Sequence, residues 1–213
     1  MALAGFLNPL QELAPPMQMA EAADGGGAAS SSGLLQGFAV SQQLESEWCW
    51  AAVSSSVANF YGPTQWTQCG VASAELAPLN CCGSDGAGAC NQPWYLDRAL
   101  TRVGHFDHIS ASSSPFAGVQ VEIGGRRPLG CRIAWAGGGA HFVALGGWLI
   151  AADGSLYVNV CDPLYGPVSK KYDDFVSAYI TTGDDWTHSY FTIGTMLVAA
   201  GGAAPNPNSP ISA

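Results

Sequence analysis

Three residues of this chain could together activate a thiol nucleophile: Cys49, His141 and Asp162. Cys49 lies in the run Glu-Trp-Cys-Trp-Ala-Ala over residues 47–52, near the start of a predicted helix. A thiol at a helix start meets the positive end of the helix dipole, which favours the nucleophilic thiolate form. Most free cysteines are inert and buried, and the acidic neighbour Glu47 opposes the thiolate. Cys49 therefore needs a cationic partner before it can act as a nucleophile.

His141 is the candidate base, and Asp162 is the candidate group that orients it. His141 opens a predicted strand over 141–150, and Asp162 follows the next one, over 156–161. The dipeptide Asp153-Gly154 between the strands is a turn signal. Either residue alone is more often structural, but an antiparallel hairpin around this turn places them nearly opposite each other. Directly paired residues have Cβ atoms about 5 Å apart, so the carboxylate could orient the imidazole.

Four residues near the candidate thiol and base could form a substrate cleft. Trp48 and Trp50 flank the thiol and could wall a groove. Gly138 and Gly139 belong to the run Ala-Gly-Gly-Gly-Ala before His141, where the missing side chains would let a substrate backbone approach closely.

The elements that must position these residues are helices in the first half of the chain and strands in the second. Apolar residues at helical spacing predict a helix from about 47, with Ser46 as its N-cap and Gly62-Pro63 as its end. Further helices are predicted over about 66–76, 93–103 and 115–122. Strands are predicted over 130–135, 141–150, 156–161 and 189–198. This order predicts an α+β protein with a helical lobe and a sheet lobe.

The predicted domain occupies the middle of the chain. Residues 1–36 are rich in Ala, Gly, Ser and Pro, as in a flexible leader, and residues 200–213 have the composition of a disordered tail. The folded domain is therefore predicted over 37–199. Its helical lobe is expected over about 37–125 and its sheet lobe over about 126–199.

Composition disfavours several classes of function. The 213 residues are 48% hydrophobic and 11% charged, which is typical of a globular protein. A net charge of −9 makes nucleic acid or an anionic membrane a poor partner. No run approaches the roughly 18 apolar residues that span a bilayer, and the N-terminus lacks the features of a standard signal peptide.

Four of the seven cysteines lie in one window: Cys69, Cys81, Cys82 and Cys90. Their grouping predicts two disulfides and hence an oxidising compartment. Adjacent cysteines are poor partners for each other, so two pairings stay open: 69–81 with 82–90, or 69–82 with 81–90. A zinc site, which usually has paired C-x2–4-C spacings, and plain buried thiols are the alternatives. We expect secretion or export by a route not visible in the sequence, with a cytoplasmic location as the alternative.

The order and setting of these residues resemble the papain-like cysteine peptidases. The similarity covers about residues 40–166 and rests on the motifs Gln-x-x-Ser-x-Trp-Cys-Trp-Ala-Ala, Gly-Gly-Gly-x-His-Phe-Val and Val-x-Val-x-Asp-Pro-x-x-Gly. They are similar to a compact bacterial branch that includes plant-pathogen effector proteases injected into host cells. The resemblance implies a papain-like fold, with the catalytic helix in an N-terminal helical lobe and an antiparallel sheet in the C-terminal lobe. It also implies that Gln43, six residues before Cys49, helps to stabilise an oxyanion.

The chain departs from papain itself at several positions. Cys49 and His141 are closer in sequence than the about 130–150 residues of the papain signature. Ser46 and Glu47 replace the Cys-Gly that opens this signature, and Asp162 stands where papain has Asn. These departures bear on substrate preference more than on the catalytic residues.

The resemblance implies an endopeptidase that acts on a protein or peptide substrate as a monomer, without metal or cofactor. A transglutaminase or other acyltransferase could use the same three residues on the same fold. A binding module that lacks catalysis is the third alternative.

Overall fold

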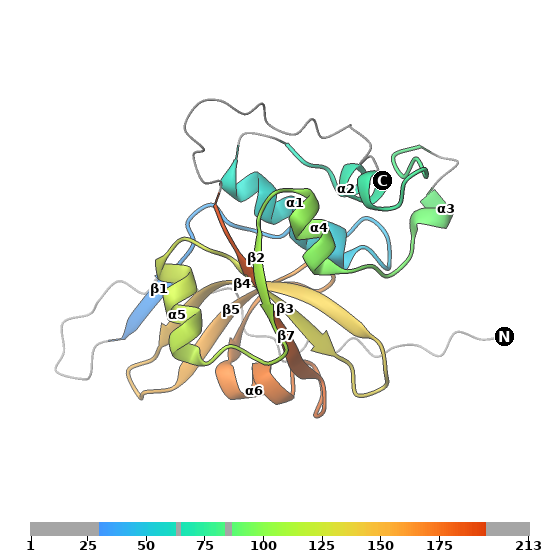
Figure 1. Ribbon diagram of the computed structural model, residues 1–213. Helices are drawn as coiled ribbons and strands as arrows, with labels where there is room; N and C mark the ends of the chain where they lie inside the picture. The colour runs from blue at the N-terminus through green and yellow to red at the C-terminus, as the bar shows by residue number, and fades with distance from the viewer. Residues whose placement is uncertain (1–29, 63–64, 84–86, 195–213) are drawn as a thin grey trace.

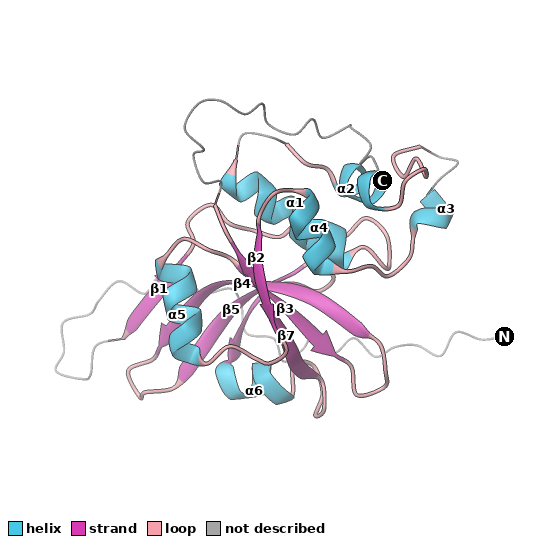
Figure 2. Cartoon of the chain, in the orientation of Figure 1, coloured by secondary structure: helices cyan, strands magenta, loops and turns pink. Residues whose placement is uncertain are grey.

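The computed structural model describes residues 30–62, 65–83 and 87–194 of the chain (Figure 1). It combines helices with an antiparallel sheet, so the predicted α+β class is confirmed (Figure 2). The helices are α1 (Cys49–Tyr61), α2 (Gln68–Glu75), α3 (Ala87–Cys90), α4 (Leu96–Arg102), α5 (Phe116–Gly124) and α6 (Tyr172–Ser177). The strands are β1 (Ser31–Leu34), β2 (Phe106–Ser110), β3 (Leu129–Ala134), β4 (Ala140–Ile150), β5 (Leu156–Asp162), β6 (Gly166–Lys171) and β7 (Asp185–Thr192).

The strands form one antiparallel sheet with the order β2-β7-β3-β4-β5-β6, and β1 pairs with β4 outside this path. β4 is the longest strand, with 11 residues. Its first half pairs with β3 and its second half with β1, while β5 lies along its other edge. The strand that carries His141 is therefore held on both edges.

Two hydrophobic clusters divide the molecule into a helical lobe and a sheet lobe. α1, α2 and α4 lie together on one side of the sheet and form the helical lobe (Figure 1). α5 and α6 pack with the sheet and form the sheet lobe. Because side chains alternate along a strand, β4 sends Phe142 to the first cluster and Val143 to the second. β4 is thus shared by the two cores, at the boundary where a site between the lobes would lie.

α1 is almost entirely buried, which explains its run of small and apolar residues. Every residue from Cys49 to Ala58 is buried. The predicted N-cap was wrong: Trp48 occupies that position, and it makes no side-chain capping bond. Ser46 lies two residues earlier, in the turn before the helix, where its hydroxyl accepts from the Asn91 amide at 3.0 Å.

Part of the predicted leader belongs to the folded domain. Residues 31–34 form β1 and pair with β4, and Leu35 is only 4% exposed. The domain boundary near residue 37 was therefore wrong, because backbone pairing rather than side-chain pattern holds this short strand. Residues 1–29 and the predicted tail over 200–213 lie outside the described residues.

The boundary between the predicted lobes was also wrong. β2 pairs with β7, and α5 packs into the core of the sheet lobe, although both were assigned to the helical lobe over about 37–125. β2 was not predicted at all, because its three central residues are all exposed and show no alternation. The last strand begins at Asp185 rather than 189, and residues 195–198 of that prediction lie outside the described part.

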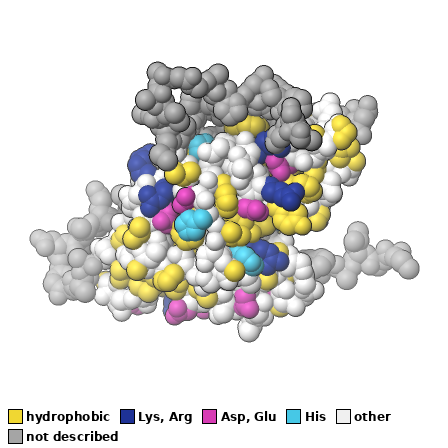
Figure 3. All heavy atoms as spheres, viewed as in Figure 1, with side chains coloured by type: hydrophobic (Ala, Val, Ile, Leu, Met, Phe, Trp, Pro, Cys, Tyr) yellow, Lys and Arg dark blue, Asp and Glu magenta, His cyan; other side chains and the backbone are white. Residues whose placement is uncertain are grey.

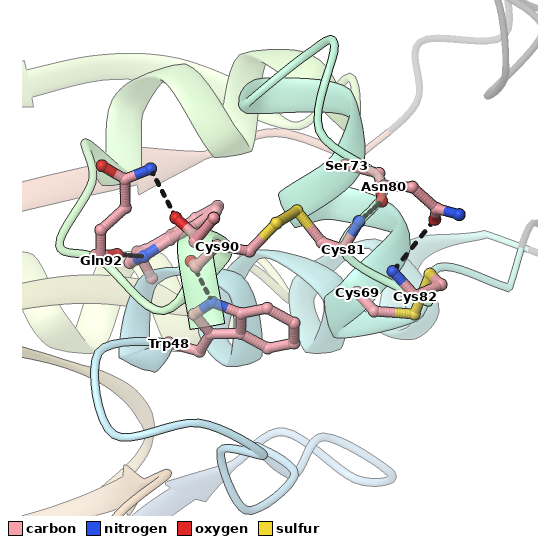
Figure 4. Close-up of a disulfide and its surroundings, with 10 residues drawn as sticks. Trp48, Cys69, Ser73, Asn80, Cys81, Cys82, Cys90 and Gln92 are labelled. Carbon is pink, nitrogen blue, oxygen red and sulfur yellow. Dashed lines mark hydrogen bonds between the residues drawn. A yellow bond between two sulfur atoms is a disulfide. The ribbon is translucent and has the colours of Figure 1, made fainter. Parts of the chain in front are cut away.

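The four clustered cysteines form two disulfides, and the structure selects the pairing Cys69–Cys82 with Cys81–Cys90 (Figure 4). All four sulfurs are used, which leaves no thiolate among them for zinc. The indole nitrogen of Trp48 donates to the carbonyl of Cys90 at 2.8 Å. The crosslinked segment is thereby fastened to the residue before α1.

The disulfides are consistent with export, since such bonds persist in oxidising compartments. None of the helices in the described residues is long and apolar enough to cross a membrane.

We expect reduction of the disulfides to lower the free energy of unfolding by roughly 2–3 kcal/mol per bridge. The bridges span 13 and 9 residues, so each restricts a short loop of the unfolded chain. Chemical denaturation with and without reductant measures the effect, and Cys81→Ser with Cys90→Ser isolates the second bridge. Non-reducing peptide mapping should recover the 69–82 and 81–90 links; four free thiols or a 69–81 link would contradict this pairing.

Candidate active site

The hairpin of β4 and β5 brings His141 and Asp162 together, with 2.9 Å between Nε2 and Oδ1. They are not directly opposite. The pair Ala144 and Cys161 sets the register, so His141 lies two residues beyond the position facing Asp162. The hairpin turns about Asp153, whereas direct pairing of residues 141 and 162 would need a turn centred between residues 151 and 152. A shift of two residues keeps both side chains on one face, and diagonal neighbours with long side chains still meet.

Hydrogen bonds occupy both oxygens of the Asp162 carboxylate. Oδ1 accepts from His141 and from the backbone N–H groups of Leu164 and Tyr165, and Oδ2 accepts from the Tyr179 hydroxyl at 2.6 Å. Burial by itself would raise the pKa of Asp162, but these donors and the charge of His141 outweigh it and lower the pKa. Asp162 is therefore a fixed negative charge beside the imidazole.

Two aromatic residues, neither of them predicted from the sequence, pack around His141. Trp135 stacks on the imidazole, with ring centroids 5.6 Å apart, and Tyr179 stacks on Trp135 at 6.4 Å. The turn after Trp135 is held by Asp184, which accepts from the Ala136 N–H at 3.0 Å. No local pattern marks these residues, because they reach the site from outside the β4–β5 hairpin.

Cys49 is the first residue of α1 and lies beside His141. Its backbone N–H belongs to the first turn, where the helix itself provides no acceptor. Burial is the largest influence on His141 and lowers its pKa, but the hydrogen bonds and charges of Asp162 and Cys49 together raise it to about 9. Because Nε2 faces Asp162, Nδ1 is the ring nitrogen left for the thiol. His141 is therefore positioned to accept a proton from the Cys49 thiol and to hold it as an imidazolium.

Gln43 lies close to the site, but its amide is already engaged. Its backbone N–H donates to the Pro163 carbonyl at 2.9 Å, next to Asp162. Its side-chain nitrogen donates to the carbonyls of Glu45 and Ser46, while Oε1 is buried without a partner in the described structure. Both amide hydrogens are thus used in the turn before α1. The oxyanion role of Gln43 stays a prediction that requires this amide to reorient.

A cavity of about 280 Å³ opens beside Cys49, between the helical and sheet lobes. Trp50 and Gly139, two of the residues predicted for a substrate cleft, border this cavity. Trp48 does not line the cavity, because its indole is directed to the Cys90 carbonyl. Gly138 has a φ of 93° and forms the turn between β3 and β4. That left-handed conformation, rather than the approach of a substrate, accounts for a glycine at this position.

No protein-family model matches the chain, and a search of the curated proteins finds no match. The function is therefore argued from the residues of the site.

We expect Asp162→Asn to move the basic limb of the pH profile of kcat/KM to lower pH. Asp162 and Cys49 together raise the pKa of His141 from 6.5 to about 9, so loss of the carboxylate lowers that pKa. An imidazolium that must protonate a leaving group is lost as pH rises through its pKa. The ion pair of His141 with Asp162 also contributes to stability. Because the pKa of His141 is raised, this contribution is complete below about pH 6.5 and disappears as pH rises through about 9.

The loss of activity should be milder than for removal of the thiol, because an Asn oxygen can still accept from Nε2. Asp153→Asn, which removes an exposed carboxylate from the hairpin turn, is the matched control and should leave the profile in place. An unmoved basic limb in Asp162→Asn would contradict the role of the carboxylate.

Proposed function

We propose that this protein is a papain-like cysteine peptidase in which Cys49 is the nucleophile, His141 the general base and Asp162 the group that orients His141. The observation that carries the proposal is the position of His141 between a buried carboxylate and a thiol at a helix N-terminus. The cavity between a helical lobe and a sheet lobe supports it, because it offers room for an extended peptide beside the thiol.

The reaction would begin with transfer of the Cys49 proton to Nδ1 of His141. The thiolate attacks the carbonyl carbon of a peptide bond, and the new oxyanion accepts from the Cys49 backbone N–H. A reoriented Gln43 amide would be the second donor; such a donor is typically worth on the order of 10²–10³ in rate. The imidazolium then protonates the leaving amine, and water hydrolyses the thioester with His141 again as base.

The two remaining free cysteines make a thiol-labelling experiment informative. Cys131 and Cys161 are buried, and burial raises the pKa of both, for Cys161 to about 12. A thiol-directed peptidase inhibitor at neutral pH should therefore modify Cys49 and leave these two intact. Peptide mapping by mass spectrometry identifies the labelled residue, and cleavage of a proteome-derived peptide mixture tests the activity. Absence of both labelling and cleavage would overturn the proposal.

An acyltransferase would use the same thioester but pass the acyl group to an amine. Incubation of enzyme and peptide with a primary amine distinguishes the two functions, because a transferase forms amide in preference to acid. A predominantly acid product supports the peptidase.

A further inference from the structure

The cavity beside Cys49 has a charged residue on each of its walls. Glu47 comes from the turn before α1, on the helical wall, and Arg132 comes from β3, on the sheet wall. Among the described residues, neither side chain makes a salt bridge. Arg132 is half-buried, so a ligand of opposite charge can compensate its charge, whereas Glu47 is exposed to solvent.

A hydrogen bond holds the Arg132 side chain in place and leaves other N–H donors of its guanidinium free. Its Nη1 donates to the Thr187 hydroxyl at 2.9 Å, and that hydroxyl donates to the Arg132 carbonyl at 3.3 Å. A guanidinium has five N–H donors, and this is its only hydrogen bond to a side chain among the described residues. A half-buried arginine with free donors is pre-organised for bidentate binding of a carboxylate.

The other walls of the cavity are aromatic and lower the local polarity. Phe142 and Tyr190 pack edge to face, with ring centroids 5.6 Å apart, and both are at most 9% exposed. Trp94 and Tyr95 close the helical side. A charge pair formed against such surfaces is screened less than a pair on the open surface.

We propose that Arg132 is a specificity-determining residue that binds an Asp or Glu side chain of the substrate, at a fixed position relative to the cleaved bond. This inference rests on the proposed peptidase function. The negative charge of Glu47 repels an acidic substrate residue on the helical wall. The cavity therefore distinguishes acidic from neutral substrates through Arg132 on its sheet wall.

The net charge of −9 does not oppose this local preference. Charges more than a Debye length away, about 8 Å at physiological salt, are largely screened. On the face drawn in Figure 3, charged side chains of both signs are interspersed with hydrophobic ones. The contact with Arg132 therefore decides the preference inside the cavity.

The first experiment digests a proteome-derived peptide mixture and aligns the cleaved bonds by mass spectrometry. Asp or Glu should be enriched at one position within a few residues of the bond. Peptide pairs that differ only by Asp or Asn at that position then give a ratio of kcat/KM. For the wild type the ratio should favour Asp by on the order of 10- to 100-fold.

Variants of the two walls should change this ratio in opposite directions. Arg132→Gln should bring it close to one, and Arg132→Glu should shift the preference to Lys. Glu47→Gln should raise it, since a repulsive charge is removed, and it tests the inference even if the arginine variants fail to fold. Lys171→Gln removes one positive charge from β6 at the far edge of the sheet and serves as the matched control.

The inference and the proposed function can fail separately. Cleavage without an acidic preference, or a preference that survives in Arg132→Gln, overturns the role of Arg132 and leaves the peptidase intact. If no peptide is cleaved, the same Asp and Asn peptides are tested for binding to Cys49→Ala protein. Tighter binding of the Asp peptide, lost in the double variant with Arg132→Gln, supports the site without the peptidase; equal binding overturns both.

Discussion

Cys49→Ala should abolish peptidase activity and leave the protein folded. The change removes the sulfur that forms the thioester, and no other thiol in the described structure lies beside His141. Loss of a nucleophile typically costs at least about 10³-fold in rate. Alanine is the best helix former and fits the first position of α1, so the unfolding temperature should change little. Peptide hydrolysis and thermal unfolding measured on the same preparation check both statements.

Cys161→Ala is the matched control for the loss of a buried thiol. Cys161 is also free and buried, and it precedes Asp162 directly, but its burial raises the pKa to about 12. This variant should keep the activity of the wild type within a few fold. Turnover above about 1% of wild type in Cys49→Ala would show that another group is the nucleophile.

His141→Ala should be nearly as severe as the loss of the thiol. Without the imidazole, the Cys49 thiol has no base, and the leaving amine has no proton donor. The substitution also leaves the buried Asp162 without its cationic partner, which costs stability. Activity should therefore be measured well below the unfolding temperature of the variant. The Asp162 carboxylate keeps its bonds from Leu164, Tyr165 and Tyr179, which supports a folded product.

His108→Ala is the control for His141→Ala, because His108 is exposed on β2 and should tolerate the change. His105 is 6% exposed, its Nδ1 bonds to the Ile193 carbonyl, and its ring stacks on Tyr61. His105→Ala should lower stability without a specific effect on chemistry. A comparable loss of activity per folded molecule in His108→Ala and His141→Ala would contradict the assignment of the base.

The sequence by itself determined the local elements that carry the candidate site. Helical spacing of apolar residues predicted α1 within two residues of its start, because a buried helix leaves a clear periodic pattern. A turn signal between two apolar runs predicted the β4–β5 hairpin, so His141 and Asp162 could be expected on neighbouring strands. The clustering of four cysteines predicted two disulfides, but adjacent cysteines left the pairing open.

Only the tertiary structure decided which side chains surround those residues. Tyr179 reaches Asp162 and Trp135 reaches His141 from separate segments, and Arg132 faces the cavity because β3 pairs with β4 in one register. Trp48, which has the same sequence neighbourhood as Trp50, is directed away to Cys90. Periodicity and turn chemistry act over a few residues, whereas these contacts join segments far apart in the chain. Their geometry depends on how the two lobes pack, and no local pattern in the sequence encodes it.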